Sequence, residues 1–175
     1  MKSTYALLNA ISLIVCGFSS TIIGGIISDK YEKKSYMTKS WVIIIGNLIG
    51  LPLFGLMCFS SNFYTAMICN ALSLLFQSSY LAPAITMCQT STTPENAGFV
   101  VGAYAFFSYI AQSIAPALFG YIANVSGAAA NPRIFGYIVF ASMLLGSTAS
   151  NIFYYRAGKQ YEKIMKAKEQ ENLKP

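Results

Sequence analysis

The sequence predicts an all-α integral membrane protein with five transmembrane helices. Of its 175 residues, 55% are hydrophobic and 10% are charged, whereas a soluble globular domain carries about 25% charged residues. The charges are also unevenly spread, because Glu95 is the only one between Lys39 and Arg133. Long uncharged stretches of this kind are typical of helices that cross a bilayer, each of which needs about 20 apolar residues.

Five apolar runs are long enough to cross a membrane. They cover residues 4–28, 40–60, 64–89, 98–123 and 134–155. Membrane β-strands are disfavoured, because such strands alternate polar and apolar residues over about 10 positions and these runs do not. The first run is also too long for a cleaved signal peptide, and only Lys2 precedes it, whereas its cluster of charged residues follows it. We therefore expect a membrane domain over residues 1–155 and a basic tail over residues 156–175.

The tail allows two interpretations. It is rich in lysine and glutamate, and Tyr161, Ile164 and Met165 recur at near-helical spacing. This spacing favours a short amphipathic helix on the membrane surface. A disordered tail is the alternative, because chain ends with few apolar residues are often not tied down.

The charges of the loops predict the orientation, because short loops rich in lysine and arginine remain in the cytosol. The first loop contains Lys30, Lys33, Lys34 and Lys39, whereas the second loop, 60–62, has no charge. We therefore expect the first loop and the C-terminus in the cytosol, and the N-terminus of this segment outside. Asn124 starts an N-glycosylation sequon on the expected outer side, next to the membrane.

Several kinds of chemistry have no support in the residues. The chain has no histidine, and its four cysteines lie within apolar runs without a C-x-x-C motif, so neither a metal site nor a disulfide framework is indicated. Hydrolase motifs are also missing, so we expect no enzyme activity and no cofactor. The net charge of +6 favours anionic membrane lipids over nucleic acid as neighbours, because the basic residues gather in one loop and one tail.

Prolines and glycines inside the runs predict local geometry. Proline removes a backbone N–H and kinks a helix, and the runs contain Pro52, Pro83 and Pro116. G-x-x-x-G pairs let helix backbones approach closely. Two such pairs are present, Gly46 with Gly50 and Gly98 with Gly102. We expect both pairs to pack against neighbouring helices.

Polar residues form stripes on three of the runs, because residues three or four apart share a helix face. Such residues at membrane depth face a bundle interior or a water-filled path. The candidates for lining a substrate path are Gln77, Tyr80, Gln112, Tyr104, Ser108, Asn9, Asn70 and Ser73. The alternative is that these side chains hold helices together through hydrogen bonds. The second and fifth runs have no equally long stripe.

Two stretches resemble the major facilitator superfamily of transporters. The pattern Gly25-x-x-x-Asp29-Lys30-x-x-Lys33-Lys34 is similar to the loop signature that joins the second and third helices of each six-helix half in that family. Glu32 stands where the family usually has glycine. Residues 80–124 look like helices ten and eleven of the Spinster-like branch, although Gln112-Ser113 replaces a Gly-Asp pair of that branch.

The resemblance implies that the chain supplies helices eight to twelve of a twelve-helix carrier that works by alternating access. Its partners would be the missing N-terminal half and a small-molecule substrate, which for Spinster-like carriers is lipid-like or amphipathic. Helices eight, ten and eleven would border the cavity, and nine and twelve would brace it. Asp29 would engage a helix N-terminus of the other half. The alternative is a non-transporting small membrane subunit that packs in a larger complex.

Overall fold

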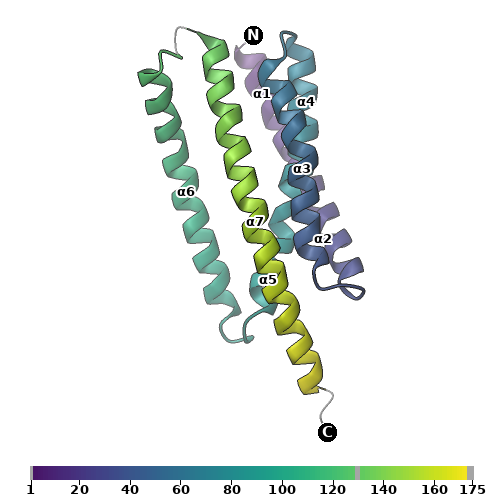
Figure 1. The fold of residues 1–175 in the computed structure, drawn as a ribbon. Coiled ribbons are helices and arrows are strands. Elements are labelled where there is room, and N and C mark those ends of the chain that lie inside the picture. The colour runs from purple at the N-terminus through teal and green to yellow at the C-terminus, as the bar shows by residue number, and fades with distance from the viewer. Residues whose placement is uncertain (1, 129–130, 173–175) are drawn as a thin grey trace.

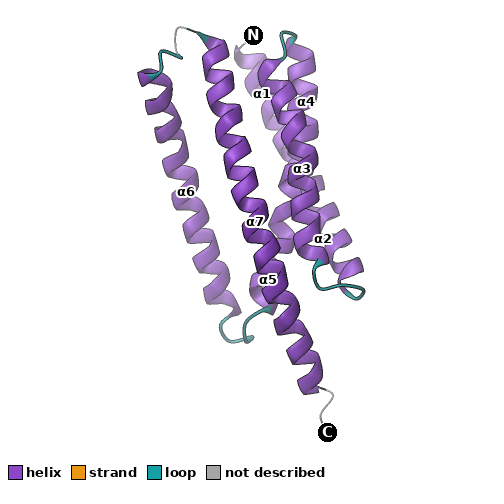
Figure 2. Cartoon of the chain, viewed as in Figure 1, coloured by secondary structure: helices purple, strands orange, loops and turns teal. Residues whose placement is uncertain are grey.

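The chain folds into a bundle of long helices that run roughly side by side (Figure 1). The computed structural model describes residues 2–128 and 131–172, and within these ranges every regular element is a helix. Short loops join the helices at the two ends of the bundle (Figure 2). The prediction of an all-helical fold is therefore confirmed.

In the described residues, nine helical segments make up five candidate membrane spans. The segments are α1 (Lys2–Ser12), the π-helical turn η1 (Leu13–Gly17), α2 (Phe18–Glu32), α3 (Thr38–Phe59), α4 (Phe63–Gln77), the 3₁₀ turn η2 (Ser78–Tyr80), α5 (Leu81–Thr90), α6 (Ala97–Val125) and α7 (Pro132–Asn172). The spans, long and apolar enough to cross a membrane, are Tyr5–Glu32, Thr38–Phe59, Phe63–Thr90, Ala97–Val125 and Arg133–Glu171.

The third span is interrupted where Pro83 follows the turn η2. Proline has no N–H to donate to the carbonyl four residues earlier, which here belongs to Ser79. This freed carbonyl faces α2 at Gly24, where an added Cβ would lie 2.5 Å from the Ser79 oxygen. The Thr21 hydroxyl of α2 also lies 3.5 Å from the Ser78 carbonyl oxygen. The predicted break at Pro83 is thus stabilised by close contact with α2, whereas Pro52 and Pro116 lie inside α3 and α6.

Glycines set the close packing of α3. A Cβ at Gly46 would lie 2.5 Å from the Phe76 carbonyl oxygen, and one at Gly50 would lie 2.5 Å from Gln77 Cγ. The prediction for this G-x-x-x-G pair is confirmed. The same prediction is wrong for Gly98 and Gly102 within the part of the chain that the structure describes, because nothing there lies within 4 Å of a Cβ added at either position.

Helix α6 stands apart from the others. It is described along its whole length and buries none of its residues. In Figure 1 it lies beyond α7, on the side away from α1 to α4. Helix α6 contacts α5 and α7, but within the described part of the chain Gly98 and Gly102 face away from any neighbour.

The tail is neither a separate surface helix nor disordered as far as Asn172, because α7 continues without a break from Pro132 to that residue. Gly158 does not end the helix, and a Cβ at this position would collide with Ser40 of α3. Tyr161, one turn further on, is buried with 1% of its surface exposed. The tail is therefore anchored by packing against the start of α3.

Candidate functional site

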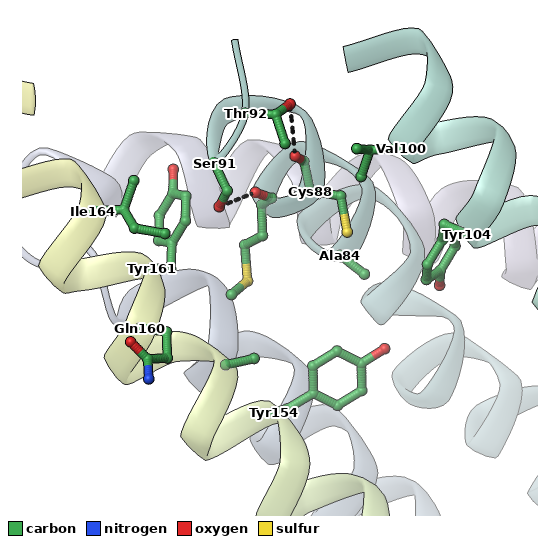
Figure 3. Close-up of a pocket in the computed structure, with 12 residues that line it drawn as sticks. Ala84, Cys88, Ser91, Thr92, Val100, Tyr104, Tyr154, Gln160, Tyr161 and Ile164 are labelled. Carbon is green, nitrogen blue, oxygen red and sulfur yellow. Dashed lines mark hydrogen bonds between the residues drawn. The ribbon is translucent and has the colours of Figure 1, made fainter. Parts of the chain in front are cut away.

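Two pockets meet at Tyr154 of α7. The larger, of about 350 Å³, lies between α5, α6 and α7 (Figure 3). The smaller, of about 180 Å³, lies between α3, the end of α4, η2 and α7. Because Tyr154 lines both, the two spaces adjoin along the same face of α7.

The larger pocket is mostly apolar. Ala84 and Cys88 come from α5, Val100 and Tyr104 from α6, and Tyr154 from α7. The rings of Tyr104 and Tyr154 approach this space from opposite sides (Figure 3). The pocket can therefore hold an apolar group beside phenol hydroxyls, without a charged side chain from its membrane-embedded walls.

The residues that line the smaller pocket are mostly polar and uncharged. Asn47, Gln77, Tyr80, Ser150 and Tyr154 line it. The amide nitrogen of Gln77 is buried and has no hydrogen-bond partner among the described residues. A buried N–H without a partner is costly, so it favours an acceptor from outside the chain, such as water or a polar ligand. Two of the predicted lining residues, Gln77 and Tyr80, thus share one pocket.

The other predicted lining residues lie elsewhere. The Asn70 amide donates to Asn9 Oδ1 at 2.9 Å, which joins α4 to α1. Ser73 is buried and donates to the Asn70 carbonyl at 3.0 Å. Ser108 donates to the Tyr104 carbonyl, and Gln112 is exposed on α6. Asn9 and Asn70 therefore link α1 to α4, whereas Ser73 bonds within α4.

We expect replacement of Asn70 by leucine to lower the free energy of unfolding by about 0.6 kcal/mol, the average for a hydrogen bond between membrane helices. The variants N9L, N70L and N9L/N70L, compared by reversible unfolding in mixed micelles, measure the coupling energy of the pair. A coupling energy of zero would contradict the link between α1 and α4.

The polar face of α7 was missed by the sequence analysis, which assigned no long stripe to the fifth run. Met143, Ser150 and Tyr154 all line the smaller pocket, and Asn151 accepts a hydrogen bond from Asn47 at 3.0 Å. The spacing of four between Ser150 and Tyr154 was the available signal, because residues four apart share a helix face.

The signature loop contains an ion pair that was also missed. Lys39 was expected in a solvent-exposed loop, but it lies in the first turn of α3 with 1% of its side chain exposed. Its ammonium group lies 2.9 Å from Glu32 Oε1 and 3.9 Å from Asp29 Oδ1. Asp29 is 61% exposed and Glu32 is 21% exposed. Glu32, the residue that departs from the family signature, is therefore the main partner of the buried lysine.

Tyr161 of α7 completes this cluster. Its hydroxyl donates to Glu32 Oε1 and accepts from Lys39 Nζ at 3.2 Å. The Thr90 hydroxyl lies 2.9 Å from the hydroxyl oxygen of Tyr161. Lys168 donates to the Thr90 carbonyl at 2.7 Å. This cluster therefore joins four elements at one point: the ends of α2 and α5, the start of α3 and the extension of α7.

Tyr36 in the same loop gives a second contact with the tail. Its hydroxyl donates to Glu169 Oε2 at 3.2 Å. Partial desolvation, followed by the hydrogen bond to Glu169, raises the pKa of Tyr36 above its ordinary value. The tail thus contacts both ends of the α2–α3 loop.

Comparison with known families decides the classification. Residues 2–173 match the family described as Major Facilitator Superfamily. The chain belongs to the major facilitator superfamily. The resemblance of the signature loop at Gly25 and Asp29 agrees with this match, and membership of this superfamily favours a transporter over an enzyme.

A distant relative also belongs to this superfamily. A protein named "MFS-type efflux pump" from Mycolicibacterium smegmatis is 25% identical over 151 residues, which cover 84% of this chain and 34% of that protein. The chain thus spans about a third of the length of the curated relative that it matches. No solved structure matches the chain significantly.

Proposed function

We propose that the chain is part of a secondary active or facilitative solute carrier that works by alternating access. The observation that carries this proposal is the superfamily match over residues 2–173, which includes the signature loop. In such carriers two bundles of helices rock around a site near the middle of the membrane. Within this proposal the chain supplies helices eight to twelve, the N-terminal half is its partner, and the signature loop and C-terminus are cytosolic.

The charge pattern of the loop supports a role for Asp29 in closing the carrier. Lys39 already has a close partner in Glu32, and Asp29 is largely exposed at the end of α2. An exposed carboxylate can bind the N–H groups at a helix N-terminus of the other half. Gly25, Lys30, Lys33 and Lys34 belong to the same loop motif. We propose that Asp29 holds the two halves together on the cytosolic side.

A lipid-like or amphipathic substrate is the second part of the proposal. The two pockets at Tyr154 combine apolar walls with hydroxyl and amide groups and have no charged residue in their membrane-embedded parts. Such a lining can pair with a neutral polar group while apolar walls cover a hydrocarbon chain. Gln77, Tyr80, Tyr104, Ser108 and Gln112 remain the proposed lining residues.

Transport by vesicles that contain the full-length carrier tests this assignment, with fluorescently labelled lysophosphatidylcholine as the probe. We expect Q77A to lower the initial rate about fivefold, because the hydrogen bond that the Gln77 amide would give the substrate is worth about 1 kcal/mol. Q112A is expected to lower the rate as well. S113A is the matched control, because the neighbouring hydroxyl of Ser113 donates to the Tyr109 carbonyl of its own helix.

Normal transport by Q77A or Q112A at wild-type expression would remove that residue from the site. Movement of small hydrophilic solutes but not of the lipid probe would overturn the substrate class. The alternative, a non-transporting subunit, predicts a reading frame that starts at Met1, whereas the carrier predicts seven further spans encoded upstream.

A further inference from the structure

A groove between α3 and α7 is separate from the two pockets at Tyr154. It has a volume of about 560 Å³. Trp41, Leu48, Ile152 and Tyr155 line it and expose between 39% and 58% of their surfaces. It is therefore an open apolar groove on the outer surface of two membrane helices.

One end of the groove has the composition of a membrane interface. The rings of Trp41 and Tyr155 meet edge to face, with centroids 6.1 Å apart. Tryptophan and tyrosine are enriched where the hydrocarbon meets the headgroups. Leu48 lies two helical turns from Trp41, or about 10 Å along α3. The groove therefore runs from the interface toward the centre of the membrane.

Two cations lie at the aromatic end. Arg156 and Lys159 line the groove, and the Lys159 ammonium group lies 4.7 Å from the centroid of the Tyr155 ring. Neither cation has a carboxylate within 4.0 Å among the described residues, whereas Lys39 and Lys166 do. Two positive charges beside an apolar groove complement a ligand with an anionic head and an aliphatic chain.

Asn151 adds a hydrogen-bond donor to the groove, one helical turn deeper in the membrane than the aromatic pair. It lines the groove four residues before Tyr155, which is about one helical turn deeper. Its side-chain oxygen accepts from Asn47, so its amide N–H groups are the donors that it can offer a ligand. The ester carbonyls of a phospholipid lie just below the phosphate, at the level where this donor stands.

We propose that this groove binds an anionic phospholipid from the leaflet on the side of the α2–α3 loop. Arg156 and Lys159 bind the phosphate, Asn151 donates to an ester carbonyl, and one acyl chain lies along Leu48 and Ile152. The two unpaired cations select an anionic lipid over a zwitterionic one.

The single tryptophan of the chain is Trp41, which makes the site directly observable. The 175-residue chain is reconstituted in phosphatidylcholine vesicles that contain a minor fraction of brominated phosphatidylglycerol, and the fluorescence of Trp41 is recorded. Bromine quenches tryptophan only at short range. We expect stronger quenching by brominated phosphatidylglycerol than by the same fraction of brominated phosphatidylcholine.

Variants separate the site from general surface attraction. R156Q/K159Q is expected to lower the preference for phosphatidylglycerol about thirtyfold, the order that two basic side chains near an anionic surface contribute. K163Q/K166Q is the matched control, because it removes the same charge from α7 outside the groove. R156K/K159R keeps both charges and should keep the preference.

T148F tests the acyl chain, because Thr148 lines the groove and phenylalanine would fill it while both cations remain. We expect T148F to lower the quenching by brominated phosphatidylglycerol. Added glycerol phosphate should not relieve the quenching in the wild-type chain.

Equal quenching by both brominated lipids in the wild-type chain would overturn the proposal. An equal loss of preference in R156Q/K159Q and K163Q/K166Q would do the same, since it would indicate surface attraction alone. Relief by glycerol phosphate would assign the cations to a free phosphate ester, and protein–protein crosslinking through this face would assign the groove to a second copy of the chain.

Discussion

Replacement of Gly46 by alanine should destabilise the bundle by about 3 kcal/mol, the upper part of the usual range for overpacked positions. The new methyl group would lie 2.5 Å from the Phe76 carbonyl oxygen and 2.6 Å from Ser79 Oγ. Backbone atoms cannot yield as a flexible side chain can, so α3 must move away from α4. Reversible unfolding in mixed micelles measures the loss.

Gly102 is the matched control for this substitution. It lies inside α6 with no described atom within 4 Å of an added Cβ. Alanine is favoured over glycine in a helix by about 1 kcal/mol, so G102A should be neutral or stabilising. The two glycines therefore predict effects of opposite sign. A destabilisation by G46A no larger than that by G102A would contradict the close contact of α3 with α4.

Replacement of Glu32 by glutamine is expected to cost about 3–5 kcal/mol, because it leaves the buried Lys39 without its main counter-charge. D29N is the matched control, since Asp29 lies 3.9 Å from the lysine and is mostly exposed. Exposed ion pairs contribute about 0–1 kcal/mol. Thermal unfolding of the two variants shows which of the two carboxylates contributes more to stability.

The double variant E32Q/K39M gives an independent test of the same cluster. Removing both charges removes the penalty of an unpaired buried ammonium group, so the double variant should be more stable than E32Q alone. Equal stability of E32Q and D29N, or a double variant less stable than E32Q, would show that Glu32 is not the main partner of Lys39.

The helical class and the superfamily could be predicted because they depend on run length, composition and one loop motif. The signature from Gly25 to Lys34 is local in sequence, and the family match includes it. Helix existence likewise depends on local apolar runs, which the bilayer selects by length.

The partners of polar side chains could not be predicted in the same way. Helical spacing places residues on one face of their own helix, but it does not say which neighbour that face meets. Asn9 and Asn70 were correctly placed on polar stripes, yet their mutual hydrogen bond joins positions 61 residues apart. Lys39 was placed in a loop exposed to the cytosol. The residue that it contacts, Tyr161, lies 122 residues further along the chain, so local sequence could not predict its burial.

The continuity of α7 has a mechanical consequence. With 41 residues this rod is about 60 Å long, roughly twice the hydrocarbon thickness of a bilayer. A tilt of roughly 10° about its midpoint would displace its far end by about 5 Å at 1.5 Å of rise per residue. A tilt of this kind would reach the junction of Glu32 and Lys39 through Tyr161, whose hydroxyl is hydrogen-bonded to both.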